Sequence, residues 1–266
     1  MTKISKNLNL SSVVGSEFFG GLTMRFKFLV YIFAMLLGSN TFAAEDIFEP
    51  TTENLVQAIM VNDVPRLQNL IRQGVDVNAK YRDRYPIHFA AEYAKSSTLQ
   101  LLIADKINLD SQVDGTGETA LHLTVGSSNV ILTQLLIDAG ENPNFVDAFG
   151  NSPLHLATEN LDLVRAILSS KQVDLNIRDQ EGKTCLMRAS GNGNPNSQVV
   201  LYLLKSGSDF SAVDAKGMSA LDHAEWWLNY FQNKPVLYAK QIQEEHLIIQ
   251  ALTGHFLPTE LLLKLR

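Results

Sequence analysis

Cysteine and basic residues are the scarce features of this 266-residue sequence. Cys185 is its one cysteine, so no disulfide can form within the chain. Lysine and arginine number 22 against 28 aspartate and glutamate residues, which gives a net charge of -6 at pH 7. Proteins that bind the phosphate backbone of nucleic acids usually carry a basic stripe, because neutralising phosphates supplies much of their affinity. The composition therefore argues against a nucleic-acid partner.

Short catalytic motifs are also missing: the sequence contains no H-E-x-x-H, G-x-S-x-G or P-loop pattern. Residues 115–120 fit G-x-G-x-x-A by letters, but no strand is expected before them, so we reject a nucleotide site there. His223, His246 and His255 lack the spacing of metal ligands. We interpret Glu244–His246 as a solvated charged run on an exposed helix face. The sequence therefore predicts no enzyme, no cofactor and no metal site.

Long apolar runs are absent, with one exception near the N-terminus. Phe28–Gly38 is an unbroken apolar run of 11 residues, which is short for a membrane-spanning helix of about 20 residues. The basic segment Met24–Lys27 precedes it, and small residues follow it. This order of regions is typical of a secretory signal peptide. We predict a signal peptide over residues 1–44, with Met24 as an alternative start and cleavage after Ala43 or Ala44.

Removal of residues 1–44 would make the protein more acidic. That segment holds four basic residues and one acidic residue, so the remainder has 18 basic and 27 acidic residues and a net charge of -9. Such a protein is not expected to seek DNA or anionic lipid. We expect an exported protein, either periplasmic or secreted. If the apolar segment is not cleaved, the protein would instead be tethered to a membrane, and this alternative stays open.

The sequence does contain an internal repeat. A hydroxyl-bearing residue, a proline or small residue, an aliphatic residue and a histidine follow one another, and the last two of the five copies are degraded. The copies are Tyr85–His88, Thr119–His122, Ser152–His155, Thr184–Met187 and Ser219–Asp222. Their fourth positions lie 34, 33, 32 and 35 residues apart. A period near 33 residues predicts a stack of similar structural units.

Two further patterns recur in step with the first. One is a polar-x-polar turn at the end of each unit, at Asp76/Asn78, Asn108/Asp110, Asn142/Asn144, Asp174/Asn176 and Asp209/Ser211. The other is Asp-x-x-Gly shortly before the four-residue motif, at Asp114–Gly117, Asp147–Gly150, Asp179–Gly182 and Asp214–Gly217. A glycine at the end of such a turn fits a backbone with positive φ.

These three registered patterns resemble the ankyrin-repeat family over roughly residues 50–253. The resemblance implies an all-α solenoid of stacked helix-turn-helix units, joined by short β-hairpin-like loops. About six units, including two caps, would occupy residues 45–253, and residues 50–80 would form the N-terminal cap. In the last unit we expect helices over Ala220–Gln232 and from Val236 to about Thr253. The apolar tail 254–266 is expected to pack on the last repeat.

Several residues acquire structural roles from the repeat. Four residues that open the motif stand where a helix begins, and their hydroxyls can cap free backbone N–H groups: Thr119, Ser152, Thr184 and Ser219. Cys185 is interpreted as a small buried residue. The resemblance implies that His88, His122 and His155 bond to the backbone and to neighbouring loops. They lie about one repeat apart, too far to share a metal ion at bond lengths of about 2 Å.

One unit is longer than the others, because loop-forming residues fill Gly191–Ser197. These residues predict an expanded turn between two helices. The insertion is either a harmless extension or a contact loop at the rim of the concave surface, and the sequence leaves both interpretations open.

In the ankyrin family, partners generally bind through the hairpin tips and the exposed side of the first helices. Tyrosine, arginine, phenylalanine and methionine at such positions are typical of interface centres. The candidate residues are Tyr81, Arg82, Arg84, Thr116, Glu118, Phe149, Asn151, Gln180, Lys183, Lys216 and Met218. We place the strongest contacts between Arg82 and Phe149, where aromatic and basic residues gather.

The sequence thus predicts a monomeric protein-binding module that acts outside the cytoplasm on another protein, whose identity it does not reveal. A membrane-tethered scaffold is the first alternative. An enzyme or small-ligand binder is the second, and it would need a deep pocket with convergent polar groups.

Overall fold

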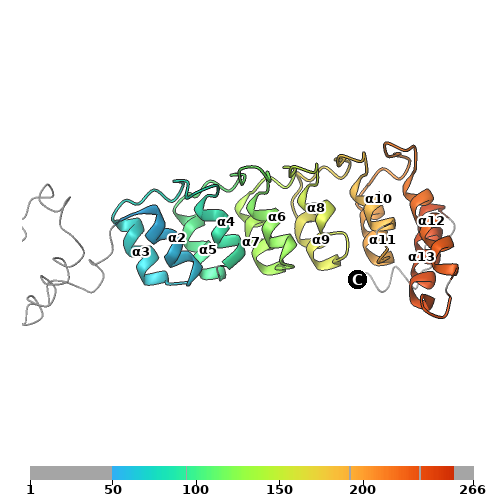
Figure 1. The fold of residues 1–266 in the computed structure, drawn as a ribbon, viewed down its shortest axis with the longest axis horizontal. Helices are drawn as coiled ribbons and strands as arrows, with labels where there is room; N and C mark the ends of the chain where they lie inside the picture. Colours follow the sequence, from blue (N-terminus) through green and yellow to red (C-terminus); the bar gives the residue numbers. More distant parts are fainter. Residues whose placement is uncertain (1–49, 94, 192, 234, 255–266) are drawn as a thin grey trace, which may run out of the picture. The chain divides into compact units, whose positions relative to one another are not determined.

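The computed structural model describes residues 50–93, 95–191, 193–233 and 235–254. The predicted signal peptide and the tail from residue 255 onward lie outside the described residues. Within the described part, twelve helices form six helix–turn–helix pairs (Figure 1). They are α2 (Thr52–Met60), α3 (Val64–Arg72), α4 (Pro86–Tyr93), α5 (Ser96–Ala104), α6 (Ala120–Gly126), α7 (Val130–Ala139), α8 (Pro153–Leu156), α9 (Leu161–Leu168), α10 (Cys185–Ser190), α11 (Ser197–Lys205), α12 (Ala220–Gln232) and α13 (Ala239–Leu252).

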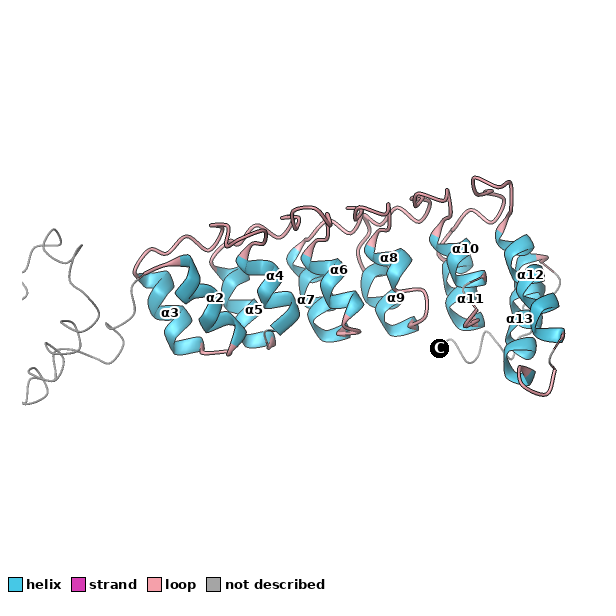
Figure 2. Cartoon of the chain, in the orientation of Figure 1, coloured by secondary structure: helices cyan, strands magenta, loops and turns pink. Residues whose placement is uncertain are grey.

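The pairs stack side by side. Each first helix, from α2 to α12, packs against the first helix of the next pair, and each second helix, from α3 to α13, does the same. The loops that join one pair to the next all run along one side of the stack (Figure 2). Two isolated bridges, Tyr81 with Arg84 and Val213 with Ser219, are the only strand-like pairings in the described part. The predicted all-α solenoid with hairpin-like loops is confirmed.

Helix starts follow from local sequence. Thr119 and Ser152 each form a capping box, in which the side chain accepts from a helical N–H while a histidine three residues later accepts from the cap backbone. This arrangement satisfies donors that a helix start otherwise leaves unpaired. Asn129, Asn160 and Asn196 cap the second helices of the middle units in a similar way.

Hydrogen bonds between units fix the stacking register. In the polar-x-polar turns, Asn78, Asp110, Asn144 and Asn176 each accept from a backbone N–H of the following unit, over 2.6–3.1 Å. The hairpin tips form a second ladder, in which the N–H groups of Asp114, Ala148, Gln180 and Ala215 donate to carbonyls of the preceding tip. Each unit is therefore stabilised mainly by its neighbours.

The buried apolar residues form two clusters. One extends from Leu55 to Ile137 and the other from Val125 to Ile248, so the residues of the third unit divide between them. Cys185 is 1% exposed, and burial raises the pKa of its thiol to about 12. Its interpretation as a buried packing residue is confirmed.

Two glutamates interrupt this apolar interior. Glu141 is 2% exposed; its Oε1 accepts from the Leu121 N–H at 2.9 Å, and its Oε2 has no partner. Glu245 is fully buried in α13, and neither carboxylate oxygen has a partner. Burial raises the pKa of each to about 8. The expectation of an exposed run at Glu244–His246 was therefore wrong for Glu245. Its position three residues before the buried Ile248 places it on the helix face that packs inward.

The last unit differs slightly from its prediction. Helix α12 has the expected bounds, but α13 begins at Ala239 rather than Val236. Val236 and Leu237 lie in the preceding turn and are 98% and 68% exposed.

Candidate protein-binding surface

The repeated histidines serve the scaffold. The Nδ1 atoms of His88, His122 and His155 accept from the backbone N–H of the motif's first residue. Their Nε2 atoms lie 2.8–3.1 Å from the carbonyls of Ser111, Asn151 and Lys183, to which they donate. Burial lowers the pKa of all three, that of His88 to about 4. The predicted bonding to backbone and neighbouring loops is confirmed.

The tip surface, meaning the hairpin tips and the exposed sides of the first helices, contains the predicted contact residues. At its N-terminal end Arg82 is exposed and lies over the Tyr81 ring, with 5.2 Å between its Cζ and the ring centroid. Arg84 is half-buried, pairs with Glu92 at 2.7 Å and lies over a phenylalanine ring. The cations of this aromatic, basic patch are thus already engaged within the chain.

In the middle of the tip surface, some of the predicted side chains are accessible to a partner and one is buried. Phe149 is 66% exposed, and Thr116 is exposed while Glu118 is half-buried. Asn151, by contrast, is 7% exposed, and its Nδ2 donates to Asp147 Oδ2 at 3.0 Å. Its inclusion in an exposed contact strip was therefore wrong: the side chain closes its own hairpin instead of facing solvent.

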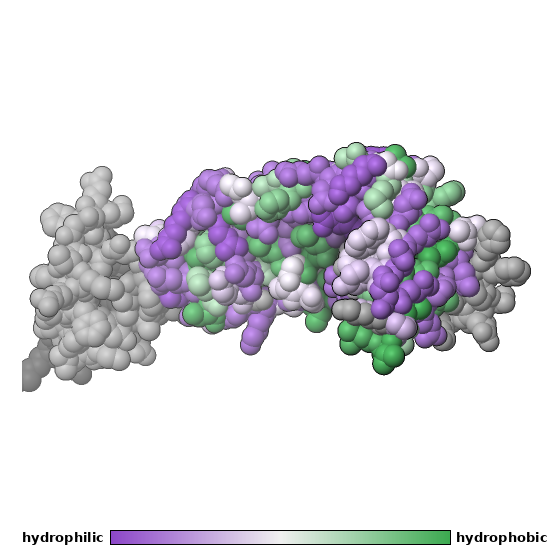
Figure 3. Space-filling view, turned by 45° about the vertical axis from the view of Figure 1, so that its right-hand side comes forward, coloured by the Kyte–Doolittle hydropathy of each residue, from purple (hydrophilic) through white to green (hydrophobic). Residues whose placement is uncertain are grey.

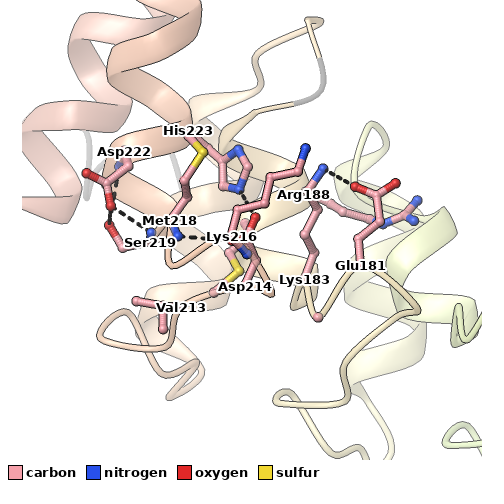
Figure 4. Close-up of polar contacts among 12 residues, drawn as sticks. Glu181, Lys183, Arg188, Val213, Asp214, Lys216, Met218, Ser219, Asp222 and His223 are labelled. Atoms are coloured by element: carbon pink, nitrogen blue, oxygen red, sulfur yellow. Dashed lines mark hydrogen bonds and ion pairs between the residues drawn. The ribbon is translucent and has the colours of Figure 1, made fainter.

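The C-terminal tips carry the remaining predicted residues. Gln180 and Lys216 are exposed, whereas Lys183 and Met218 are half-buried. Figure 4 shows that Lys183 pairs with Glu181, with 2.8 Å between Nζ and Oε2. Lys216 and Met218 lie on the next tip, where their backbone N–H groups donate to Asp214.

Buried aspartates hold these C-terminal tips and also bind a basic side chain. Asp179 pairs with Arg188 at 2.7 Å. Asp214 pairs with His223 at 3.0 Å, a contact that can be followed in Figure 4. Burial by itself would raise the pKa of each carboxyl, but backbone N–H donors and the basic partner lower it overall. Both aspartates are therefore ionised at neutral pH and fix Arg188 and His223 in place.

A hollow of about 380 Å³ opens on the tip surface between α8 and α10. Its lining residues are His155, Leu156, Thr158, Glu159, Glu181, Lys183, Arg188 and Gly191. Leu156 is the exposed apolar residue of this lining. The charged residues of the lining are Glu159, Glu181, Lys183 and Arg188. Of the predicted contact residues, the structure brings only Lys183 to this hollow.

The sequence analysis did not predict the hollow. The unequal lengths of the repeats were the only sequence feature that indicated an irregular surface there. Helix α8 has only four residues, so the surface beside α10 is left uncovered. The described residues of the 191–196 turn bend toward both neighbouring units. The Asn194 and Asn196 amides donate to Glu159, and a Cβ at Gly193 would lie 2.8 Å from the Trp227 ring. The insertion is therefore packed between units at one edge of the hollow.

This arrangement suits recognition of a partner's side chains. In the described residues, no group of three His, Cys, Asp or Glu could hold a metal ion, and no helix has the length and apolar character to cross a membrane. The hollow is open and mixed in charge, so it can accept a polar side chain of either sign while Leu156 contacts its aliphatic part.

Comparisons with known proteins agree with this fold. A profile described as ankyrin repeats (three copies) matches residues 55–132, 126–214 and 160–232. The B-cell lymphoma 3 protein homolog of Mus musculus is 39% identical over 113 residues, which cover 40% of this chain and 25% of that protein. The probable 26S proteasome regulatory subunit p28 of Saccharomyces cerevisiae is 30% identical over 142 residues, which cover 52% of this chain and 62% of that protein. The chain thus spans less than two thirds of these relatives.

A solved structure covers more of the molecule. It is a chain from the complex of a predatory endopeptidase of Bdellovibrio bacteriovorus with an immunity protein. The similarity has a TM-score of 0.62 and 25% sequence identity, and it covers 77% of this chain and 100% of that one. Because the repeat profile spans more than half of the chain, and the structure is a stack of such helix pairs, the protein belongs to the ankyrin-repeat family.

Proposed function

We propose that this protein is a protein-interaction module that acts outside the cytoplasm and binds its partner through the tip surface. The hollow between α8 and α10 carries the proposal, because it is a recess on the surface that ankyrin proteins generally use. The exposed Phe149 is a suitable aromatic anchor; its carbonyl accepts from the N–H of Gln180, the residue before the hollow-lining Glu181. The apolar Phe28–Gly38 segment, with its basic start, supports export.

The solved complex suggests a more specific version of this function. That complex pairs a predatory endopeptidase with an immunity protein. By analogy, we propose that this chain binds an exported enzyme and holds it inactive. The acidic charge predicted for the processed chain would speed encounter with a basic partner.

Capture from cell fractions tests the binding function. The full-length protein with a C-terminal affinity tag should capture one abundant protein from an extracytoplasmic fraction. Phe149→Ala and Lys183→Glu should each weaken that capture about tenfold or more, without lowering thermal stability. Ile131→Ala is the matched control, because Ile131 is 69% exposed and lies on α7, a second helix. Equal loss in all three variants would contradict a site on the tip surface.

Intact mass and N-terminal sequencing test the location separately. A chain beginning at Ala44 or Glu45 in an extracytoplasmic fraction supports export. A chain that retains Phe28–Gly38 in membranes makes the protein a tethered scaffold. If a captured partner has hydrolytic activity, titration with this protein should abolish that activity at one equivalent; unchanged activity would remove the inhibitory version.

A further inference from the structure

Helix α12 presents an unusual exposed face. The last unit of a repeat stack normally has a polar outer surface, which keeps the stack soluble. Here Trp226 is 55% exposed and Tyr230 is 46% exposed, on the longest first helix of the described stack. Their rings are stacked, with 6.0 Å between centroids and 7° between planes. Figure 3 shows hydrophobic and hydrophilic residues side by side at the C-terminal end of the stack.

The charges of this face have one sign. Asp222 lies one helical turn before Trp226, and Tyr230 lies one turn after it. Glu225 is exposed on the adjoining row, and Asp222 is exposed as well. Hydrogen bonds from Ser219 lower the pKa of Asp222, so this carboxylate is charged at neutral pH. We call Asp222, Glu225, Trp226 and Tyr230 the aromatic stripe; it contains two carboxylates and no cation.

Other rings of the chain show which group suits such a surface. Arg82, Arg84 and Arg165 each lie over an aromatic ring of this chain, with 5.1–5.8 Å from Cζ to the centroid. A guanidinium stacks on an aromatic face and can donate to a carboxylate at the same time. Trp226 and Tyr230 are likewise aromatic and about half exposed to solvent, and the exposed carboxylates of Asp222 and Glu225 lie within one helical turn of Trp226.

We propose that the aromatic stripe is a docking site for an arginine-bearing segment of a partner protein. This proposal rests on the proposed binding function and names the chemistry of its partner. Charge complementarity decides between partner classes: the two carboxylates attract a basic peptide, and they oppose contact with an anionic membrane surface. The stripe lies on the first helix of the unit after α10, so a partner in the hollow could reach it.

The test uses the full-length protein and a blocked peptide with two arginines separated by glycine. Trp226 and Trp227 are the only tryptophans of the chain, so tryptophan fluorescence reports on this helix. The peptide should change that fluorescence in a saturable way and bind more weakly as salt increases. A lysine peptide should bind less tightly, and a peptide with uncharged citrulline should not bind measurably.

Two variants locate the binding. Indole Nε1–H resonances in NMR spectra provide a readout that remains when one tryptophan is replaced. Trp226→Ala should weaken arginine-peptide binding about 3- to 30-fold. Glu225→Lys should weaken it similarly, whereas Asp105→Lys should have little effect, because Asp105 is an exposed acid at the C-cap of α5, in another unit. Circular dichroism should show all three variants folded.

Each contrary outcome has a definite meaning. If Glu225→Lys and Asp105→Lys weaken binding equally, the peptide is held by net charge and the proposal is overturned. If the citrulline peptide binds as well as the arginine peptide, recognition of a cation is overturned. Binding to neutral phosphatidylcholine vesicles through Trp226, without peptide binding, would make the stripe a membrane contact. If the natural partner is captured normally by Trp226→Ala, the binding function stands and the stripe is not part of it.

Discussion

The three N-terminal helix pairs keep the repeat period closely, whereas the three C-terminal pairs depart from it. The first helices α2, α4 and α6 have nine, eight and seven residues; α8, α10 and α12 have four, six and thirteen. In the regular half, Arg82 and Arg84 lie over aromatic rings of the chain, and Arg84 also pairs with Glu92. The irregular half has a hollow, a long turn and an exposed aromatic stripe. In a repeat protein, departures from the period therefore create the recesses and exposed side chains that a partner can recognise.

The two halves meet in the third unit, and the largest predicted effect concerns the buried acid there. Glu141→Gln keeps an acceptor for the Leu121 N–H but cannot ionise. The folded pKa of Glu141 is about 8 against a reference value of 4.5. The unfolded chain therefore releases its proton first, and the wild type loses stability as pH rises from about 4.5 to 8. The variant should gain roughly 3–5 kcal/mol relative to wild type between these pH values.

Urea unfolding at pH 5 and pH 8 measures this difference. Glu245→Gln in the C-terminal half is the companion variant and should show the same sign, because burial also raises the pKa of Glu245 to about 8. A gain for Glu141→Gln that does not depend on pH would show that Glu141 is charged in the folded protein.

Close stacking of the C-terminal tips predicts the next effect. A Cβ at Gly182 would lie 2.8 Å from the Ala215 amide nitrogen, whereas a Cβ at Gly217 would meet nothing within 4 Å. Both glycines have a φ of +77°. Gly182→Ala should cost about 2–4 kcal/mol, from backbone strain and steric overlap together. Gly217→Ala should cost only about 1 kcal/mol. Thermal unfolding of both variants checks the difference, and equal losses would mean that the tips separate easily.

The sequence period predicted the fold because each unit repeats the same physical requirements. Capping residues, turn glycines and inward aliphatic residues recur in register, so the bounds of α12 were obtained correctly from sequence. The histidine contacts were implied by the resemblance to the ankyrin-repeat family.

The direction in which individual side chains point within a unit was harder to predict. Asn151 lies at a tip but turns into its own hairpin, and Glu245 lies in a charged run but on the inward helix face. The hollow required knowing where the long turn folds, which depends on contacts with Trp227 and Glu159 far along the chain. Spacing alone could show that α8 and α10 differ, but not that a recess lies between them.

A buried tip aspartate bound to a basic side chain distinguishes the C-terminal half further, because Asp114, which pairs with Lys80 in the N-terminal half, is exposed. Arg188→Met removes the donor to Asp179, whose side chain is 1% exposed, and leaves that carboxylate with backbone partners only. The loss should be about 1–3 kcal/mol at pH 7. Because the folded pKa of Asp179 is lowered, this contribution is present above its reference value of 3.8 and disappears as pH falls below it. Unfolding measured at pH 7 and pH 3 tests the trend; an equal loss at both would point to lost packing instead.

The smallest effect on stability is expected for an ion pair at the surface of the N-terminal half. Arg84 and Glu92 lie 2.7 Å apart, but their side chains are 20% and 38% exposed. Solvent screens such a pair, so Glu92→Gln should cost about 0.5 kcal/mol and less at high salt. Chemical denaturation at 50 mM and 500 mM salt measures both values. A loss as large as that of Arg188→Met would mean that the N-terminal tips depend on their ion pairs as strongly as the C-terminal tips do. The contrast between the halves would then lie in helix length alone.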